Sequence, residues 1–298
     1  MEMDRIDKLA ASVLDGYLVR KDLVRTFSRQ FPVPTYVVEF MLGRYCASTN
    51  QDEIDEGLGI VERQLKSRTV KAGEEELFKA RAREQGEVKI IDIISARLDE
   101  KSDSYLATLP SLQLKDVRIS PEIVSEHERM LTGGFYAEIT LVYDAAIAQE
   151  NRGRPFGVEN IRAIQMSQRN VLDTLAKARK KFTTEEWKAF LLRSIGVEPD
   201  GLSERAKDVF MLRMVPFVER NYNLVELGPR GTGKSHLFQQ ISPYAHLVSG
   251  GKATVAKMFV DNNSGRRGLV CQYDVVCFDE ISGISFDKKE GINIMKGY

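Results

Sequence analysis

Residues 228–235 combine glycines, a lysine and a serine at a spacing that suits phosphate binding. They match the pattern G-x-x-x-x-G-K-[ST] at every fixed position. Glycine lets the backbone wrap a phosphate with no Cβ in the way, Lys234 can reach the β- and γ-phosphates, and the Ser235 hydroxyl can hold Mg²⁺. The sequence therefore predicts a site for ATP and Mg²⁺ formed by Gly228, Pro229, Arg230, Gly231, Thr232, Gly233, Lys234, Ser235 and the adjoining His236.

The segments on either side of this motif fit the same chemistry. The apolar run Leu224–Leu227 predicts a buried strand before it, and residues 235–241 predict a helix after it. A strand, a glycine-rich loop and a helix in that order direct backbone N–H groups and a helix N-terminus at one point, which makes an anion site. A chance glycine-rich turn is the alternative explanation for the motif.

A second motif supports the first. Residues 273–280 predict an apolar strand that ends in two acids, Asp279 and Glu280. Asp279 can bind Mg²⁺ together with Ser235, and Glu280 can orient and polarise the attacking water, because phosphoryl transfer depends on positioning and electrostatics. An acidic pair also ends many ordinary strands, so its weight comes from occurring with the glycine-rich loop.

The composition excludes several classes of protein. The 298 residues are 43% hydrophobic and 29% charged, with a formal net charge of zero, so any contact with DNA must come from a local basic patch. The three cysteines form no CxxC pair and suit a reducing compartment, and the three histidines are scattered, so no metal cluster is expected. Apolar runs stay too short for a membrane span, and we expect a cytoplasmic protein.

The hydrophobic pattern predicts a multidomain protein of α+β and α/β type. Residues 5–84 show helical spacing, and residues 88–143 show several short strands, with a turn or bulge near Lys115–Asp116. These strands predict a small β-barrel or compact sheet, for which an OB-like barrel is one option. We place an N-terminal helical and β-rich domain at residues 1–150 and a P-loop α/β domain at residues 151–298.

The second half begins with a predicted linker at residues 151–157. A long helix should follow, with Val158, Ile161, Ile164, Val171 and Leu175 on its apolar side. Three further signals are a capping box at residues 183–186, an N-cap at Ser203, and Pro216, which should kink or stop the helix that Ser203 opens.

A polar turn at residues 261–268 follows a strand predicted at residues 254–260. It carries Arg266 and Arg267. The turn is either a plain hairpin tip or a basic loop presented to DNA or to a neighbouring subunit.

Three stretches carry a resemblance to a known family: GPRGTGKSH, AKMFVDNNSGRRGLVCQYDVVCFDEISGI and FTTEEWKAFLLRSIG. The chain resembles the N-terminal portion of the BrxL family, the Lon-like AAA+ ATPases of bacterial BREX phage-defence systems. The resemblance implies an N-terminal domain, an AAA+ ATPase domain with Glu280 as its catalytic acid, and a Lon-like C-terminal domain. It also implies hexamers that stack, DNA binding and a role in phage restriction, and it makes residues 151–298 a partial AAA+ domain. We expect the DNA binding to be largely indifferent to sequence, because Lys and Arg side chains would contact phosphates.

The chain departs from that family pattern because it stops at Tyr298. The sensor strand, arginine finger and lid of an AAA+ domain cannot fit after Glu280, so we expect a fragment with negligible ATP hydrolysis of its own. Two other functions stay open at this stage. One is a DNA-binding module that uses nucleotide only to control its assembly, and the other is a component of an ATP-dependent Lon-like protease.

Overall fold

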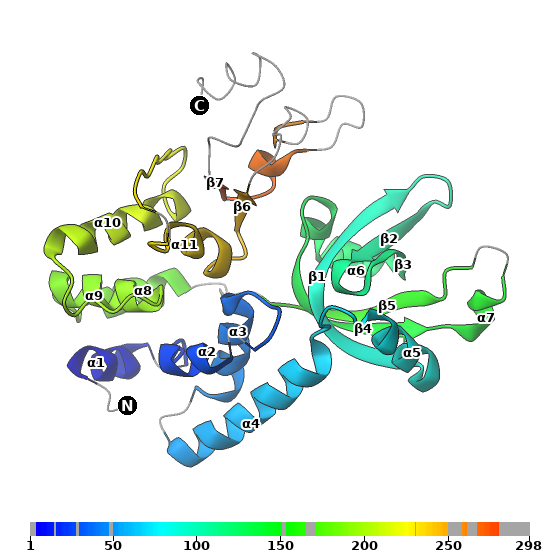
Figure 1. Ribbon diagram of the computed structural model, residues 1–298, viewed down its shortest axis with the longest axis horizontal. Helices are drawn as coiled ribbons and strands as arrows, with labels where there is room; N and C mark the ends of the chain where they lie inside the picture. Colours follow the sequence, from blue (N-terminus) through cyan, green and yellow to red (C-terminus); the bar gives the residue numbers. More distant parts are fainter. Residues whose placement is uncertain are drawn as a thin grey trace.

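The computed structural model describes residues 4–14, 16–27, 30–47, 50–150, 153–164, 171–229, 231–249, 258–260 and 267–279. Its first part is helical, as the sequence predicts, with helices α1 (Arg5–Val13), α2 (Lys21–Phe27), α3 (Thr35–Tyr45), α4 (Gln51–Arg68) and α5 (Glu75–Gln85). Helix α4 runs from this helical group towards a barrel on the opposite side of the molecule (Figure 1).

Short polar side chains set where these helices start. The Asp4 carboxylate accepts a hydrogen bond from the Asp7 amide at 2.9 Å, and the Asn50 side chain accepts one from the Asp52 amide at 3.0 Å. The apolar faces of α2, α3 and α4 then pack into one core that includes Val37, Val38, Met41, Leu42, Val61 and Leu65. Helix α5 instead contributes Phe78 to the core of the barrel. Packing of these faces holds the helices together, because isolated helices of this length are marginal in water.

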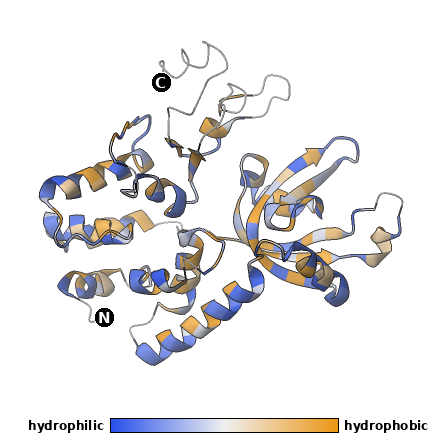
Figure 2. Cartoon of the chain, viewed as in Figure 1, coloured by the Kyte–Doolittle hydropathy of each residue, from blue (hydrophilic) through white to orange (hydrophobic). Residues whose placement is uncertain are grey.

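The strands form the predicted barrel. Its strands are β1 (Glu87–Asp99), β2 (Ser104–Leu109), β3 (Leu114–Ile119), β4 (Phe135–Tyr143) and β5 (Phe156–Ala163). They close in the order β1-β2-β3-β5-β4, with β3 and β5 parallel and the other pairs antiparallel. Helix α6 (Pro121–Glu126) lies between β3 and β4 along the chain. Hydrophobic and hydrophilic residues alternate along the strands, and the hydrophobic ones fill the interior (Figure 2).

The bulge predicted near Lys115–Asp116 is confirmed. Ala107 pairs with Val117 while Leu109 pairs with Leu114, so β3 contains one more residue than β2 between these two pairs. The extra residue explains the change of parity in the sequence, since Leu114 and Val117 both pack into the barrel core despite their odd spacing.

The helix predicted from Val158 is wrong over its first part and confirmed over its later part, because Val171 and Leu175 lie in helix α8 (Val171–Arg179). Of the predicted linker, residues 153–155 have no regular structure, residues 156–157 open a strand, and residues 151–152 lie outside the described residues. Strand β5 occupies Phe156–Ala163, where Ile161 pairs with Ile139 of β4 and Val158 pairs with Ile119 of β3. The spacing of Val158, Ile161 and Ile164 fits a helix, yet Val158 and Ile161 complete a barrel that would otherwise keep open strand edges, and Ile164 is buried in the core of the helical group. The boundary proposed between residues 150 and 151 stays a prediction.

The helices that follow obey their sequence signals. They are α8 (Val171–Arg179), α9 (Thr184–Ser194) and α10 (Glu204–Met214), while the short helix α7 (Ala145–Ala148) lies earlier, between β4 and β5. Both bonds of the capping box at Thr183 and Glu186 are present, and the Ser203 hydroxyl accepts from the Ala206 amide. Helix α10 gives way to a 3₁₀ turn that contains Pro216, as predicted.

The last part of the described chain contains α11 (Lys234–Gln240) and a parallel pair of strands, β6 (Ala245–Ser249) and β7 (Val275–Asp279). Helix α11 and strand β7 confirm their predictions, whereas β6 was not expected. The strand predicted at Leu224–Leu227 is wrong: the run has no regular structure, and Leu227 is 90% exposed. Most of the strand expected at residues 254–260 lies outside the described residues, and Val260 forms only an isolated bridge with Arg267.

Candidate nucleotide-binding site

The glycine-rich loop adopts a backbone that requires its glycines. Gly231 has a φ of +77° and Gly233 a φ of +75°, both in the left-handed region that side chains disfavour. Gly233 is also the N-cap of α11, so the loop leads directly into the helix. Arg230 lies outside the described residues. The loop and the helix therefore follow the order that the sequence motif predicts.

The Lys234 ammonium lies over its own loop. It donates hydrogen bonds to the Gly228 carbonyl oxygen at 3.1 Å, to the Pro229 carbonyl oxygen, and to the Thr232 hydroxyl at 3.3 Å. These contacts hold the ammonium against the loop. When a phosphate binds there, its oxygens can replace the carbonyl oxygens as hydrogen-bond acceptors for Lys234.

Ser235 and Asp279 meet although 44 residues separate them along the chain. The Ser235 hydroxyl donates a hydrogen bond to Asp279 Oδ2 at 2.9 Å. Ser235 lies in the first turn of α11 and Asp279 ends β7, so helix and strand together place a hydroxyl and a carboxylate side by side. Hydroxyl and carboxylate oxygens are ligands that Mg²⁺ prefers, so this pair can hold the ion beside a triphosphate. Glu280 lies outside the described residues.

A small apolar core fixes this helix against the strands. Leu237 and Phe238 of α11 are buried with Val275 of β7, and the rings of Phe217 and Phe238 stack at a centroid distance of 5.6 Å. The core therefore positions α11 and β7, and with them Ser235 and Asp279.

An ion pair that the sequence analysis missed supports the segment before the loop. Arg213 of α10 is only 7% exposed, donates two hydrogen bonds to the Glu226 carboxylate, and lies over the Phe210 ring at 4.6 Å. The pair ties the run at residues 224–227 to α10 although the run forms no strand. The available signal was an arginine within the apolar last part of α10, residues 209–214, but its partner depends on the tertiary fold.

The N-terminal part of the chain contacts this region at two places. The Thr35 amide and hydroxyl donate to Gln240 Oε1 at 3.0 and 3.2 Å, which joins α3 to the end of α11. Arg129, from the loop between α6 and β4, donates to the Pro243 carbonyl oxygen at 2.6 Å and lies over the Tyr244 ring at 4.3 Å. Helices and barrel therefore both contact the segment that follows the P-loop helix.

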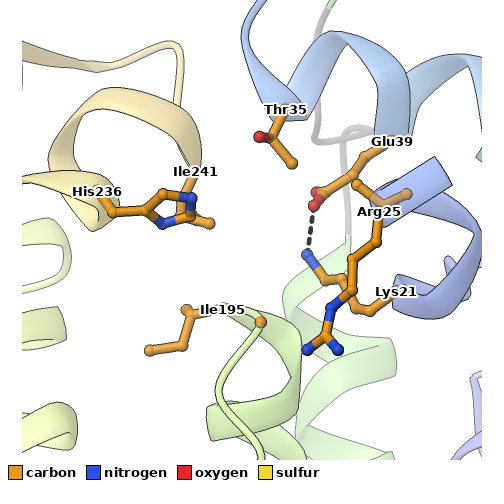
Figure 3. Close-up of a pocket in the computed structure, with 9 residues that line it drawn as sticks. Lys21, Arg25, Thr35, Glu39, Ile195, His236 and Ile241 are labelled. Atoms are coloured by element: carbon orange, nitrogen blue, oxygen red, sulfur yellow. Dashed lines mark hydrogen bonds and ion pairs between the residues drawn. The ribbon is translucent and has the colours of Figure 1, made fainter. Parts of the chain in front are cut away.

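A cavity of about 490 Å³ opens between α2, α3, the end of α9 and α11. Figure 3 shows Lys21, Arg25, Thr35 and Glu39 on one side of it and His236 and Ile241 on the other. His236 follows Ser235 directly, so one wall of the cavity begins next to the phosphate loop.

The basic pair proposed for DNA is described only in part. Arg267 is exposed and bridges to Val260 in antiparallel fashion, as a hairpin would, while Arg266 lies outside the described residues. The Arg267 carbonyl oxygen accepts a hydrogen bond from the Gln272 side chain at 2.6 Å.

Two negative findings apply to the described ranges alone. They contain no group of three or more histidine, cysteine, aspartate or glutamate residues that could hold a metal ion. Their helices are too short or too polar to cross a membrane.

The three cysteines should differ sharply in reactivity. Burial, together with the charges of Asp279 and Glu226, raises the pKa of the Cys277 thiol to about 11, and burial also raises the pKa of Cys46. At pH 8 about one Cys277 thiol in a thousand would be ionised, and the thiolate is the reacting form. A disulfide reagent should therefore label the exposed Cys271 first, and Cys277 only as the pH approaches its pKa. Equal labelling of Cys271 and Cys277 at pH 8, read by mass spectrometry, would contradict the placement of β7.

Known proteins are similar to this chain over nearly its whole length. Residues 12–143 match a family model described as "BREX system Lon protease-like protein BrxL N-terminal", and residues 156–298 match one described as "Lon-like protease BrxL-like, ATPase domain". A protein named Lon-like protease BrxL from Escherichia coli O9:H4 (strain HS) is 43% identical over 98% of this chain. Another of that name from Bacillus cereus (strain H3081.97) is 41% identical over 95% of it.

The chain spans 42% of the length of each of these relatives. The two family models follow one another along the chain, and the second includes the glycine-rich loop, Ser235 and Asp279. The chain therefore belongs to the BrxL family, of which it carries the N-terminal and ATPase-domain regions.

Proposed function

We propose that this chain is the nucleotide-binding part of an AAA+ ATPase subunit that binds ATP with Mg²⁺ in the intact protein. The hydrogen bond between Ser235 and Asp279 carries the proposal. It brings together the two residues that the separate motifs assign to Mg²⁺, although nothing in their sequence spacing requires them to meet. The match to an ATPase-domain family supports the same assignment.

The role of this pair can be tested through the Mg²⁺ dependence of ATP binding. Ser235→Ala and Asp279→Asn should each remove most of the gain in affinity that Mg²⁺ gives, while binding without Mg²⁺ stays close to wild type, because only the metal ligands change. Calorimetry with and without Mg²⁺ measures both quantities. Ser242→Ala is a matched control, since Ser242 also lies near α11 but does not contact Asp279. If Mg²⁺ raises the ATP affinity of both variants as much as that of wild type, Ser235 and Asp279 are not the Mg²⁺ ligands.

Hydrolysis is tested in the full-length protein. Glu280→Gln should retain ATP and lose turnover, because the amide keeps the shape of the side chain but cannot polarise water as a carboxylate does. Unchanged turnover would remove Glu280 from this role.

We further propose that the intact protein engages DNA in a ring-shaped assembly during phage defence. The barrel supports this part: it has five strands, a parallel β3–β5 pair, and a helix between β3 and β4, as expected of an OB-like fold. Barrels of this type often bind single-stranded nucleic acid. The relatives are named Lon-like proteases, and the BREX family name supports the defence role.

The DNA contact should be salt-sensitive and largely indifferent to sequence, because phosphate contacts dominate such binding. Arg266→Glu combined with Arg267→Glu should weaken DNA binding of the full-length protein about tenfold or more and leave ATP binding unchanged. Fluorescence anisotropy with two unrelated DNA sequences measures the effect. Unchanged affinity would leave residues 261–268 as a hairpin tip only.

A further inference from the structure

The cavity between the N-terminal helices and α11 has the composition of a small-molecule site. Its volume of about 490 Å³ falls within the roughly 300–1,000 Å³ of known ligand pockets. Ile195 and Ile241 supply apolar surface, and Figure 3 shows both facing the interior together with His236. Apolar walls with a few fixed polar groups suit a flat organic ring better than a bare phosphate.

The polar wall comes from helices α2 and α3. Glu39 is 3% exposed and accepts a hydrogen bond from Lys21, so a buried carboxylate is held in a fixed place beside the cavity. Arg25 is exposed and forms no ion pair within the part of the chain that the structure describes, which leaves its guanidinium available. The Thr35 backbone and hydroxyl fix the distance between this wall and α11 through Gln240.

The cavity also lies in the right place for one particular ligand. Its His236 wall is adjacent in sequence to Ser235, and consecutive Cα atoms lie about 3.8 Å apart. A nucleotide whose phosphates bind the glycine-rich loop would therefore reach the cavity with the groups attached to its α-phosphate.

We propose that this cavity receives the adenosine part of ATP, and that helices α2 and α3 of the N-terminal region form one wall of the nucleotide site. The inference rests on the proposed function, because the phosphates must occupy the glycine-rich loop. In this arrangement Arg25 and Glu39 contact the nucleoside, while Ile195 and Ile241 enclose the base. Nucleotide binding then holds residues 21–39 against α11 and links the N-terminal region to the ATPase region directly.

The test compares ATP with inorganic tripolyphosphate, both with Mg²⁺, on this chain and two variants. Tripolyphosphate has the phosphates without the nucleoside, so its affinity measures binding at the glycine-rich loop. The difference in affinity between ATP and tripolyphosphate then measures the contribution of the cavity. Arg25→Ala should weaken ATP binding about tenfold, as expected for loss of a charged hydrogen bond, and leave tripolyphosphate binding unchanged. Ile195→Trp should fill the cavity and weaken ATP binding further, again without affecting tripolyphosphate.

Leu172→Trp on the exposed face of α8 is the matched control for the added ring, since Leu172 is 80% exposed. Hydrogen exchange gives an independent readout: ATP, but not tripolyphosphate, should slow exchange in residues 21–39. Equal losses for both ligands, or ATP affinity that neither variant changes, would overturn the inference. If wild-type protein binds neither ligand, the proposed function itself fails. If tripolyphosphate binds and both variants keep the ATP affinity of wild type, the cavity is not the adenosine site, and the proposed function still stands.

Discussion

Replacing Lys234 with alanine should lower the affinity for ATP by about 10- to 150-fold, which corresponds to a hydrogen bond from a charged group worth about 1.5–3 kcal/mol. Its ammonium is bound by carbonyl and hydroxyl oxygens of the same loop. Phosphate oxygens are stronger acceptors because they are charged, so ATP binding should draw the ammonium away from the loop oxygens. Calorimetric titration with ATP measures the loss.

Two variants separate charge from packing in this experiment. Lys234→Met keeps most of the aliphatic chain and removes only the charge, so it should lose nearly as much affinity as Lys234→Ala. Lys207→Ala is the control for a distant lysine, because Lys207 pairs with Glu204 on the surface of α10. ATP affinity that stays within twofold of wild type in both Lys234 variants would exclude this loop as the phosphate site.

Replacing Gly134 with alanine should destabilise the chain by about 2–5 kcal/mol, the sum of an unfavourable left-handed backbone and an overpacked contact. Gly134 has a φ of +79°, and a Cβ there would lie 2.5 Å from the Ile94 carbonyl oxygen. That oxygen belongs to the backbone of β1, so the barrel strand itself must move to relieve the clash.

Gly73→Ala is the matched control for this substitution. Gly73 has a φ of +89°, yet a Cβ there would meet nothing within 4 Å. Gly73→Ala should therefore lower the free energy of unfolding by about 1–2 kcal/mol, the cost of the left-handed backbone alone. Urea unfolding followed by circular dichroism gives both values. Equal losses in the two variants would show that the close approach of Gly134 to β1 does not occur in solution.

The sequence determined the local features of this protein. A side-chain oxygen at the right offset from a helix start specifies a cap, so the capping box at residues 183–186 and the cap at Ser203 were predictable. The end of α10 near Pro216 was predictable because proline lacks a backbone N–H. The bulge near Lys115 was predictable because one extra residue reverses the parity of every later side chain in a strand. The left-handed backbone at Gly231 and Gly233 was predictable because glycine adopts such conformations without steric cost.

Only the tertiary structure decided which segments pair. Residues 156–163 carry helical spacing but complete the barrel, since closure satisfies the edges of β3 and β4. The run at residues 224–227 is apolar yet exposed, because burial requires partner strands as well as apolar side chains.

The candidate site shows the same division between local and long-range information. Ser235 and Asp279 were each identified from a local motif, but their contact depends on the packing of α11 against β7. The bonds from Thr35 to Gln240, and the cavity beside them, join segments more than 200 residues apart. Contacts at such separations depend on how whole elements pack, so no local pattern in a single sequence encodes them.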